Sequence, residues 1–427
     1  MSKKKCVIVG VGSRGTLSYL EPIASGHLSD VCEMCGIYDK EMSRALLCSR
    51  EHGNIPVFDD FDAMLDTVKP DFVIVTSMDS NHHEYIIRAL DRGYDVVSEK
   101  PMTNTREKAL AIMEAEKRSG HTVRTTFNMR YMKPIEDLKK VIDSGVIGKV
   151  THVDFSWLLD RRHGADYFRR WHRYLDNSTG LLVHKSTHHF DVVNWVIEKK
   201  PLSVFARCTL EFYGKNGPFR GENCRKCEHA SECALRSDIS TDPFHKKYYF
   251  DIEEETGYCR DSCVFAEDID IYDRMALSVL YEDGVTMNYS LVAYSPFEGA
   301  RWRFIGTNGT VEMEYYGSGK RAHSKVGTTF MEEVTARGEK LVGEGTIAIR
   351  VSPADAEEYI VMTSFGSGSH GGSDDRMRDD IFRAPDENDP LHHAAPSIEA
   401  YYSLAIGDAA VMSNRLGREV RLEELPG

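Results

Sequence analysis

A glycine-rich turn between a short strand and a helix constrains this sequence more than any other feature. Residues 5–10 are a β-branched run ending in glycine, and a helical stretch follows directly. The first glycine of such a turn permits the tight bend, the second lets a pyrophosphate approach the backbone, and the third lets the helix pack on the strand. Free amides at the helix start can then bind phosphate. The pattern predicts a dinucleotide-binding site formed by Gly10, Gly12, Ser13, Arg14 and Gly15.

An acidic residue follows the second expected strand, residues 31–38. This residue is Asp39, and a carboxylate at this point can accept hydrogen bonds from the adenosine ribose hydroxyls. It would also repel a 2′-phosphate. We therefore expect NAD rather than NADP as the cofactor, although the adjacent Lys40 slightly weakens that preference.

Strands and helices alternate along the first third of the chain. Further strands are expected at 71–76, 94–98 and 122–127, and helices at 81–92, 106–118 and about 134–144. Such alternation builds a doubly wound parallel sheet with helices on both faces. We expect an α/β protein with an N-terminal Rossmann domain over residues 1–127 and a connecting helix to about residue 149.

Longer strands with period-two alternation begin near residue 150. They are expected at 151–158, 203–212, 276–281, 286–292 and 301–305, with a crossing helix at 186–197 and a late helix at 394–416. They predict a C-terminal α+β domain over 150–415 with an open, mainly antiparallel sheet. A cysteine-bearing insertion is expected at about 213–272, and a C-terminal strand and tail at 416–427.

Length and charge limit the partners of this chain. Its 427 residues suit two domains, and its formal net charge of -14 disfavours a nucleic-acid surface. The apolar stretch Cys6 to Val11 is too short to span a bilayer, and no signal-peptide pattern follows Lys3 to Lys5. We expect a cytoplasmic protein without membrane or nucleic-acid partners. The exposed face of an open sheet favours a homodimer or homotetramer.

Two segments resemble motifs of a known family. Residues 73–84 (VIVTSMDSNHHE) and 96–101 (VVSEKP) resemble the cofactor-side motifs of the Gfo/Idh/MocA family, the glucose-fructose oxidoreductase and inositol dehydrogenase group. The Glu-Lys-Pro triplet is that family's most specific signal, and residues 180–195 resemble its second motif. The resemblance covers most of the chain except the insertion. It implies cofactor-binding residues at Thr76, Ser77, His82, Glu99 and Lys100.

The same resemblance implies catalytic roles for two residues. Lys100 would bind a substrate hydroxyl beside the nicotinamide, and His188 would act as the acid/base. Their chemistry suits these roles, because hydride loss from a carbinol carbon requires removal of the hydroxyl proton, and imidazole has an ordinary pKa of about 6.5. A lysine near oxidised nicotinamide can also stabilise the developing alkoxide and share the proton relay.

The chain departs from the family pattern at two positions. The family usually has aspartate where His184 stands and proline where Met78 stands. If residues 184–191 are helical, His184, His188 and Asp191 share one face, which predicts a catalytic pair with an orienting carboxylate. A histidine pair at this spacing can also bind zinc, a role we place second.

A cationic and aromatic segment, residues 160–173, follows the first strand of the second sheet. Aromatic faces stack on sugar C–H surfaces and arginine forks bind anions, so an anionic glycoside is one candidate substrate. A solvated loop or a subunit contact is the alternative. The polar loop 369–374 could close over substrate or form a simple turn. The candidate substrate-binding residues are Lys185, Arg162, His163, Tyr167, Trp171 and His172.

Five cysteines gather in the insertion. Four of them, Cys224, Cys227, Cys233 and Cys263, supply enough thiolates for a closed zinc site, and Cys259 is the fifth. An iron–sulfur cluster uses the same ligands, and unliganded thiols are the alternative. We expect such a site to stabilise the insertion rather than to catalyse.

The leading prediction is NAD-dependent oxidation of a secondary hydroxyl of a sugar or glycoside. Some members of the resembled family are NAD-dependent glycoside hydrolases, which oxidise the sugar, eliminate the leaving group, add water and reduce the ketone again. That redox-neutral cycle needs a further base, which His184 or Lys185 could supply. A protein that binds NAD without turnover is the third possibility, and the presence of both Lys100 and His188 argues against it.

Overall fold

The apolar strands of the first third of the chain form a five-stranded parallel sheet. Its strands lie in the order β2 (Cys32–Tyr38), β1 (Lys4–Val9), β3 (Phe72–Val75), β4 (Asp95–Ser98) and β5 (Val123–Thr125). Alternate side chains of β1 enter different cores, Cys6 and Ile8 on one face and Val7 and Val9 on the other. Burial on both faces explains why these strands are nearly continuous apolar runs. The expected doubly wound sheet is confirmed.

The structure is a computed structural model that describes residues 2–319, 346–383 and 389–426. The expected second domain includes residues 320–345 and 384–388, which lie outside the described residues. No helix of the described part is long and apolar enough to cross a membrane.

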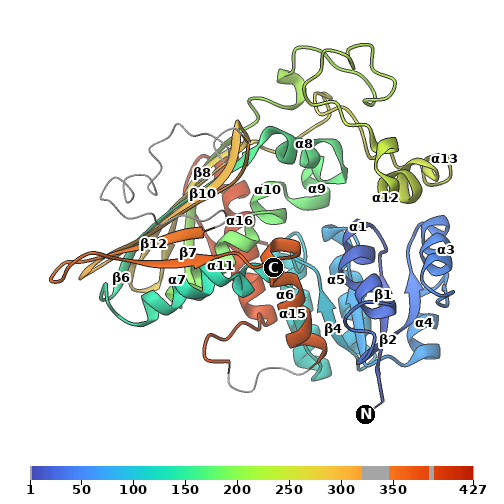
Figure 1. Cartoon of the computed structure of the whole chain (residues 1–427), viewed down its shortest axis with the longest axis horizontal. Helices are drawn as coiled ribbons and strands as arrows, with labels where there is room; N and C mark the ends of the chain where they lie inside the picture. The colour runs from blue at the N-terminus through green and yellow to red at the C-terminus, as the bar shows by residue number, and fades with distance from the viewer. Residues whose placement is uncertain (1, 320–345, 384–388, 427) are drawn as a thin grey trace.

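Helices cover both faces of the parallel sheet (Figure 1). One face packs against α1 (Ser13–Gly15), η1 (Thr16–Leu20), α2 (Glu21–Ala24) and α3 (Met42–Glu51). The other packs against α4 (Phe61–Val68), α5 (His82–Asp91) and α6 (Arg106–Ser119). Two helices from the end of the chain join these cores, α15 (Ser373–Phe382) on the first face and α16 (Ser397–Leu416) on the second.

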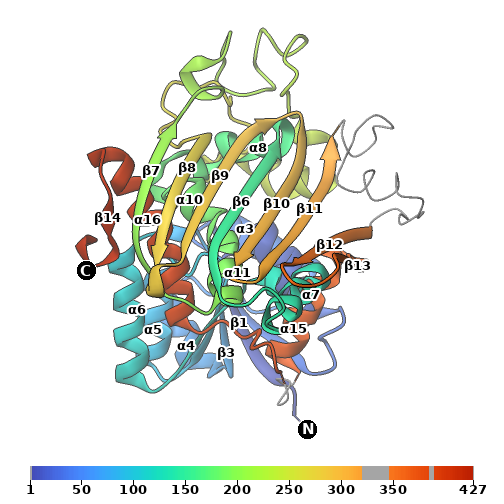
Figure 2. The ribbon, with the colours of Figure 1, turned by 90° about the vertical axis from the view of Figure 1, so that its left-hand side faces the viewer.

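A nine-stranded mixed sheet forms the rest of the framework, and Figure 2 shows it with α16 behind the strands. Every second residue of β8 is buried, as the period-two pattern predicts. β6 and β9 pair in parallel and the other neighbours antiparallel, so the mainly antiparallel sheet is confirmed. The strand order is β13 (Tyr359–Ser364), β12 (Thr346–Pro353), β11 (Gly309–Gly319), β10 (Phe297–Gly306), β6 (Val150–Asp160), β9 (Thr286–Ser295), β8 (Arg274–Tyr281), β7 (Pro201–Thr209) and β14 (Val420–Arg421).

The helices between β5 and β7 carry the chain from one sheet to the other. The crossing helix predicted at 186–197 is α11 (Thr187–Ile197), but residues 185 and 186 separate it from α10 (Leu181–His184). The remaining helices are α7 (Lys133–Asp143), α8 (Arg161–Arg169) and α9 (Leu175–Ser178).

The insertion between β7 and β8 reaches from the mixed sheet to the parallel sheet (Figure 1). Its helical elements are short: α12 (Pro243–His245), η7 (Lys246–Phe250) and α13 (Glu253–Thr256). Tyr248 and Tyr249 pack into the same core as the first face of the parallel sheet. The insertion therefore contacts both halves of the chain.

A buried ion pair joins the end of the parallel sheet to α11. Arg130, in η3 (Asn128–Tyr131), donates from Nε to Asp191 Oδ2 over 2.8 Å, and both side chains are 1% exposed. The carboxylate of Glu399 lies 2.6 Å from the same guanidinium. Asp191 was expected to orient the catalytic histidines, and this expectation is wrong because Arg130 occupies both of its oxygens. The pair fixes the helix that carries His188.

Replacing Arg130 with methionine should destabilise the protein strongly. The substitution leaves Asp191 buried without its guanidinium partner, so we expect the free energy of unfolding to fall by about 3–5 kcal/mol. Urea unfolding measures this change. Arg88→Met is the matched control, because its pair with Asp62 is 38% and 32% exposed and its loss should cost about 0–1 kcal/mol. Equal losses in the two variants would contradict the structural role.

Candidate active site

A cleft of about 660 Å³ lies at the carboxyl ends of the parallel strands, where open α/β sheets bind ligands. Residues that follow β1, β2, β3 and β4 line it, and α8, α10, α11 and the insertion supply its other walls. The sequence-predicted residues that it brings together are Gly10, Gly12, Ser13, Arg14, Asp39, Thr76, Ser77, His82, Glu99, Lys100, His163, Tyr167, Trp171, His172, His184, Lys185 and His188.

The glycine turn has the close packing that its sequence predicts. Gly10 has a φ of +90°, and a Cβ there would lie 2.8 Å from the Ser77 nitrogen. A Cβ on Gly15 would lie 2.1 Å from the Gly10 oxygen, so this residue serves the packing of helix on strand and does not line the cleft. Thr76 Oγ1 donates to the Gly10 carbonyl over 2.5 Å, which ties β3 to the turn.

A tyrosine of the insertion contacts this turn directly. The Ser13 amide donates to Tyr249 Oη over 2.8 Å. The Tyr249 ring also lies under two guanidinium groups, 5.1 Å from that of Arg44 and 4.6 Å from that of Arg260. Sequence reasoning missed these contacts because no motif in the insertion marks them.

Asp39 is 7% exposed and stands beside the turn. Its Oδ2 accepts from the Val11 amide over 2.8 Å, and its Oδ1 accepts from the Glu41 amide over 2.9 Å. Arg44 Nη1 lies 3.6 Å from the same carboxylate. The backbone therefore fixes the orientation of the carboxylate at the rim of the cleft.

Glu99 and Arg14, both predicted cofactor residues, bind each other. Glu99 Oε1 accepts from Arg14 Nε over 2.6 Å and from the Tyr19 hydroxyl over 2.7 Å. Arg14 also donates from Nη1 to Asp374 over 3.1 Å, and Asn128 donates to the same carboxylate over 2.6 Å. Asn128 was missed, and loop 369–374 was selected without its bond to Arg14, because 246 and 360 positions separate the partners of these bonds.

His82, also a predicted cofactor residue, connects two turns beneath the cleft. Its ring nitrogens lie 2.9 Å from the Pro101 carbonyl oxygen and 3.0 Å from the Ser77 carbonyl oxygen. Burial lowers the pKa of this histidine. The contacts hold the turn after β3 against the turn after β4.

Lys100 projects from the end of β4 toward α10. Its ammonium donates to the His184 carbonyl over 2.8 Å, which leaves two further N–H donors. Burial in the cleft lowers the pKa of Lys100 to about 8, although the charges of Asp79 and Glu99 oppose that shift. The amine can therefore lose its proton near neutral pH.

His184 stands where the family usually has an aspartate, and its ring binds the carboxyl group of another residue, Asp79. Its Nδ1 lies 2.6 Å from Asp79 Oδ2. Burial lowers the pKa of His184 and raises the pKa of Asp79, so it opposes the charge on both partners. The His172 ring packs against the His184 ring with centroids 4.1 Å apart.

His188 lines the cleft from the first turn of α11. Its ring contacts the edge of Phe127 at a centroid distance of 5.7 Å. Within the described part of the chain, its buried Nδ1 has no hydrogen-bond partner. Burial lowers the pKa of His188 well below its ordinary value, and the Lys100 charge lowers it further. The imidazole is therefore neutral at physiological pH and can accept a proton.

The first part of the cationic and aromatic segment, residues 160–173, forms helix α8, and one face of this helix lines the cleft. His163, Asp166 and Tyr167 line the cleft with i, i+3 and i+4 spacing, and Arg170, the first residue after the helix, joins them. Arg162, a predicted substrate residue, is exposed and lies outside the cleft lining because it falls between these positions. Arg170, which the prediction omitted, lines the cleft and donates to Asp166 over 2.6 Å.

The other predicted substrate residues make dense aromatic contacts. Trp171 stacks on His172 with centroids 3.7 Å apart, and the His163 Nε2 lies 3.2 Å from the Tyr167 hydroxyl. The ammonium of Lys185 lies 5.1 Å from the centre of the Trp157 ring. From the polar loop 369–374, His370 lines the cleft, and its Nδ1 lies 2.9 Å from Asp374.

The cysteines predicted as metal ligands lie elsewhere. Cys224, Cys227, Cys233 and Cys263 line a separate small cavity in the insertion, and Cys259 does not. In the described residues, the one group whose potential ligand atoms lie within 4.8 Å of one another is Glu253, Cys259 and Asp261.

Comparisons with known proteins agree with this architecture. A family model described as an oxidoreductase family with an NAD-binding Rossmann fold matches residues 4–127. The model of that family's C-terminal alpha/beta domain matches residues 139–422. YteT of Bacillus subtilis strain 168, described as an oxidoreductase, is 33% identical to this chain over 99% of its length and 98% of that protein.

Two further relatives are similar over different extents. D-glucoside 3-dehydrogenase of Escherichia coli K12 is 32% identical over 28% of this chain and 34% of that protein. A solved levoglucosan dehydrogenase with NADH and levoglucosan has a TM-score of 0.66 at 16% identity and covers 99% of this chain and 100% of that one. Since the two family models together span nearly all of the sequence, the chain belongs to the Gfo/Idh/MocA family of NAD-dependent oxidoreductases.

Proposed function

We propose that this protein oxidises a secondary hydroxyl of a sugar or glycoside, with Lys100 and His188 relaying the hydroxyl proton. The observation that carries the proposal is that these two side chains line one cleft with the dinucleotide turn, and burial lowers the pKa of both. Lys100 can therefore exchange a proton near neutral pH, and His188 is held in the neutral form that can accept one, as alcohol oxidation requires.

The residues of the cleft suit a bound dinucleotide. Gly12 has no side chain that would keep a pyrophosphate from the backbone. Asp39 follows the glycine turn at the sequence separation expected of a carboxylate that binds the adenosine ribose. Ser77 Oγ is buried beside the turn without a hydrogen-bond partner in the described part of the chain. When bound, NAD⁺ would supply the hydride acceptor.

The protein's own groups account for the proton. In its unprotonated form, Lys100 has one N–H beyond the one that binds the His184 carbonyl, and its lone pair can accept the hydroxyl proton. The ammonium that forms then stabilises the developing alkoxide. The neutral ring of His188 is placed to accept the proton.

A polyol-type substrate is supported by the cleft's composition and by the names of the relatives. D-glucoside 3-dehydrogenase, inositol 2-dehydrogenase and levoglucosan dehydrogenase are named for cyclic polyols or sugars. Trp171 and Tyr167 supply aromatic faces for sugar C–H groups. Lys185 has no ion pair or hydrogen bond from its ammonium to a described residue, so it can meet a substrate hydroxyl or an anionic substituent.

The pairing of His184 with Asp79 favours one alternative, the redox-neutral glycoside hydrolase. That cycle needs a second base to remove a proton from the carbon next to the oxidised one. His184 lines the same cleft, and Asp79 orients its ring. Lys185 is the other candidate for this base, because burial lowers its pKa.

Product analysis should distinguish the two activities. With a panel of glycosides and stoichiometric NAD⁺, we expect NADH to accumulate in proportion to a keto-sugar product, because the hydride leaves with the cofactor. Absorbance and mass spectrometry measure the two products. Cleavage of the glycoside without net NADH would reject the dehydrogenase in favour of the hydrolase, and failure to convert any of a broad panel would contradict both.

Removing the lysine amine should abolish most turnover. Lys100→Ala is expected to lower kcat/KM by about 10²–10⁴-fold, the usual contribution of acid–base catalysis, while NAD⁺ still binds. The matched control is Lys108→Met, whose ammonium also donates to a carbonyl, that of Ser80 at 2.9 Å, but lies outside the cleft. It should change kcat/KM by no more than about twofold. Similar losses in both variants would show that Lys100 is only structural.

The pH dependence of oxidation should report the lysine. Because the unprotonated amine takes part in the relay, kcat/KM for the sugar at saturating NAD⁺ should rise with pH, with a midpoint near or below the pKa of about 8. The positive nicotinamide would lower that midpoint further. Lys100→Arg keeps the charge but holds its proton above pH 12, so this step should vanish along with most activity. An unchanged midpoint in Lys100→Arg would assign the titration to another group.

A further inference from the structure

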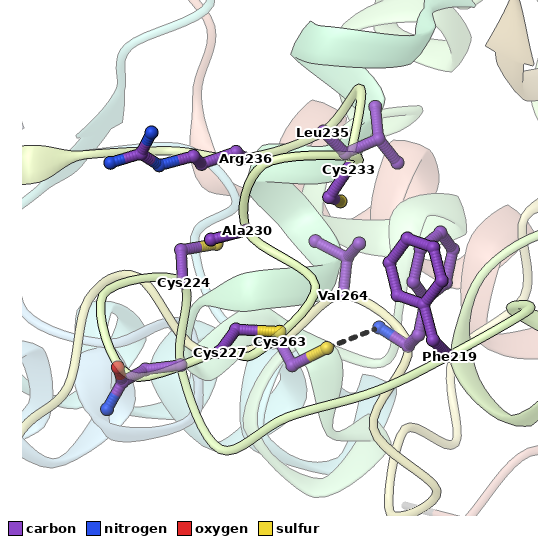
Figure 3. A pocket seen from close by; sticks show the side chains of 11 residues that line it. Phe219, Cys224, Cys227, Ala230, Cys233, Leu235, Arg236, Cys263 and Val264 are labelled. Carbon is purple, nitrogen blue, oxygen red and sulfur yellow. Dashed lines mark hydrogen bonds between the residues drawn. The ribbon is translucent and has the colours of Figure 1, made fainter.

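Four cysteines from distant parts of the insertion surround one small cavity (Figure 3). The cavity has a volume of about 20 Å³, room for about one water-sized sphere. Its remaining walls are mainly apolar and include Phe219, Leu235, Val264 and Phe265. Besides the cysteines, its polar lining residues are Asn223 and Arg236, and Arg236 is exposed.

The backbone brings the two halves of this cluster together. Asn223 and Ser262 form an antiparallel bridge. The Cys224 amide donates to the Asp261 carbonyl over 3.0 Å, and the Cys263 amide donates to the Glu222 carbonyl over 3.1 Å. Cys227 and Cys233 follow in a turn, where the Cys233 amide donates to the His229 carbonyl over 3.1 Å. The convergence therefore does not depend on side-chain rotamers.

Hydrogen-bond donors already face the sulfurs. The Phe265 amide donates to Cys263 Sγ over 3.4 Å, the dashed line in Figure 3, and Arg169 Nη1 lies 3.6 Å from Cys224 Sγ. Such donors stabilise a thiolate and are typical of the surroundings of metal-bound cysteines.

We propose that Cys224, Cys227, Cys233 and Cys263 bind one structural zinc ion. Four thiolates satisfy the tetrahedral preference of zinc and leave no open position for catalysis. The small cavity suits a single ion, whereas an iron–sulfur cluster would add several iron and sulfide atoms to the same volume. Since no three of these four sulfurs lie within 4.8 Å of one another, binding requires rotation about their χ1 bonds to bring the sulfurs together.

The fifth cysteine is excluded from the proposed site. Cys259 Sγ donates to Asp261 over 3.3 Å, away from the cavity lining. The carboxylates beside it, Asp261 and Glu253, already bind the guanidinium of Arg225, whose Nε lies 2.7 Å from Asp261. This group therefore holds a cation of the protein's own, and Cys259 provides a matched control.

The proposed zinc site is linked to the cofactor cleft through the chain itself. The segment that carries Cys263 also carries Tyr258 and Arg260, which line the cleft. Arg260 lies over Tyr249, whose hydroxyl binds the Ser13 amide of the glycine turn. Zinc at the far end of this segment would restrict its motion and hold these residues in place. Loss of zinc should therefore weaken dinucleotide binding without altering any group that relays protons.

Metal analysis of the full chain, purified without chelator, tests the site. We expect elemental mass spectrometry to find about one zinc ion per chain. Cys224→Ser and Cys233→Ser should lose most of it, and Cys259→Ser should keep it. Absence of zinc from the wild-type protein would overturn the proposal. So would iron with acid-labile sulfide, a disulfide among the four cysteines, or equal loss from Cys259→Ser.

Because a ligand variant could fail to fold, the wild-type protein provides a second measurement. Zinc is removed from the intact chain with a strong chelator and then restored. We expect faster proteolysis within residues 213–272 and a severalfold higher Kd for NAD⁺ after removal, with both reversed by zinc and not by magnesium. Unchanged proteolysis would overturn the structural role. An unchanged Kd alone would overturn only the link to the cofactor, and the metal content does not depend on the proposed sugar oxidation.

Discussion

The half-buried amine of Lys100 is the constraint on which the cleft depends. The residue lies two positions after β4 of the parallel sheet, yet its ammonium donates to a carbonyl of α10, which leads into the mixed sheet. A charge withdrawn from water is costly unless partners surround it, so the two halves of the chain must meet in one orientation to supply them. The His184 to Asp79 hydrogen bond crosses the same boundary. Assembly of the two halves and adjustment of the lysine pKa are therefore one event.

The insertion also joins the two halves of the chain, at the end of the cleft where the glycine turn lies. Tyr249 packs into a core of the parallel sheet and binds the Ser13 amide, although the insertion leaves the chain between two strands of the mixed sheet. A lobe with such short helices has little core of its own. Its order must come from contacts with both sheets and, as proposed, from four cysteines around one ion.

The predicted residues that line the cleft were selected from patterns close together in the chain. The glycine turn, Asp39 and Lys100 each follow a strand directly, and the carboxyl ends of parallel strands share one edge of the sheet. The prediction for Asp191 failed for two reasons. It extended helical spacing through residues 185 and 186, where the helix is interrupted. In addition, Arg130, which is distant in the sequence, binds the Asp191 carboxylate. Arg162 was selected for its charge, but it lies on a face of α8 outside the cleft lining, whereas Arg170, just after the helix, reaches the cleft.

Local pattern was thus enough to define the family, the α/β fold and the cofactor turn, since each rests on strand, turn and helix signals within a few residues. Folding alone decided which partners complete the cleft: Tyr249 at the turn, Asp374 beside Arg14, and Asp79 beside His184. These bonds join residues 236, 360 and 105 positions apart. No sequence period extends so far, and such groups meet only because burying both sheets against their helices brings them together.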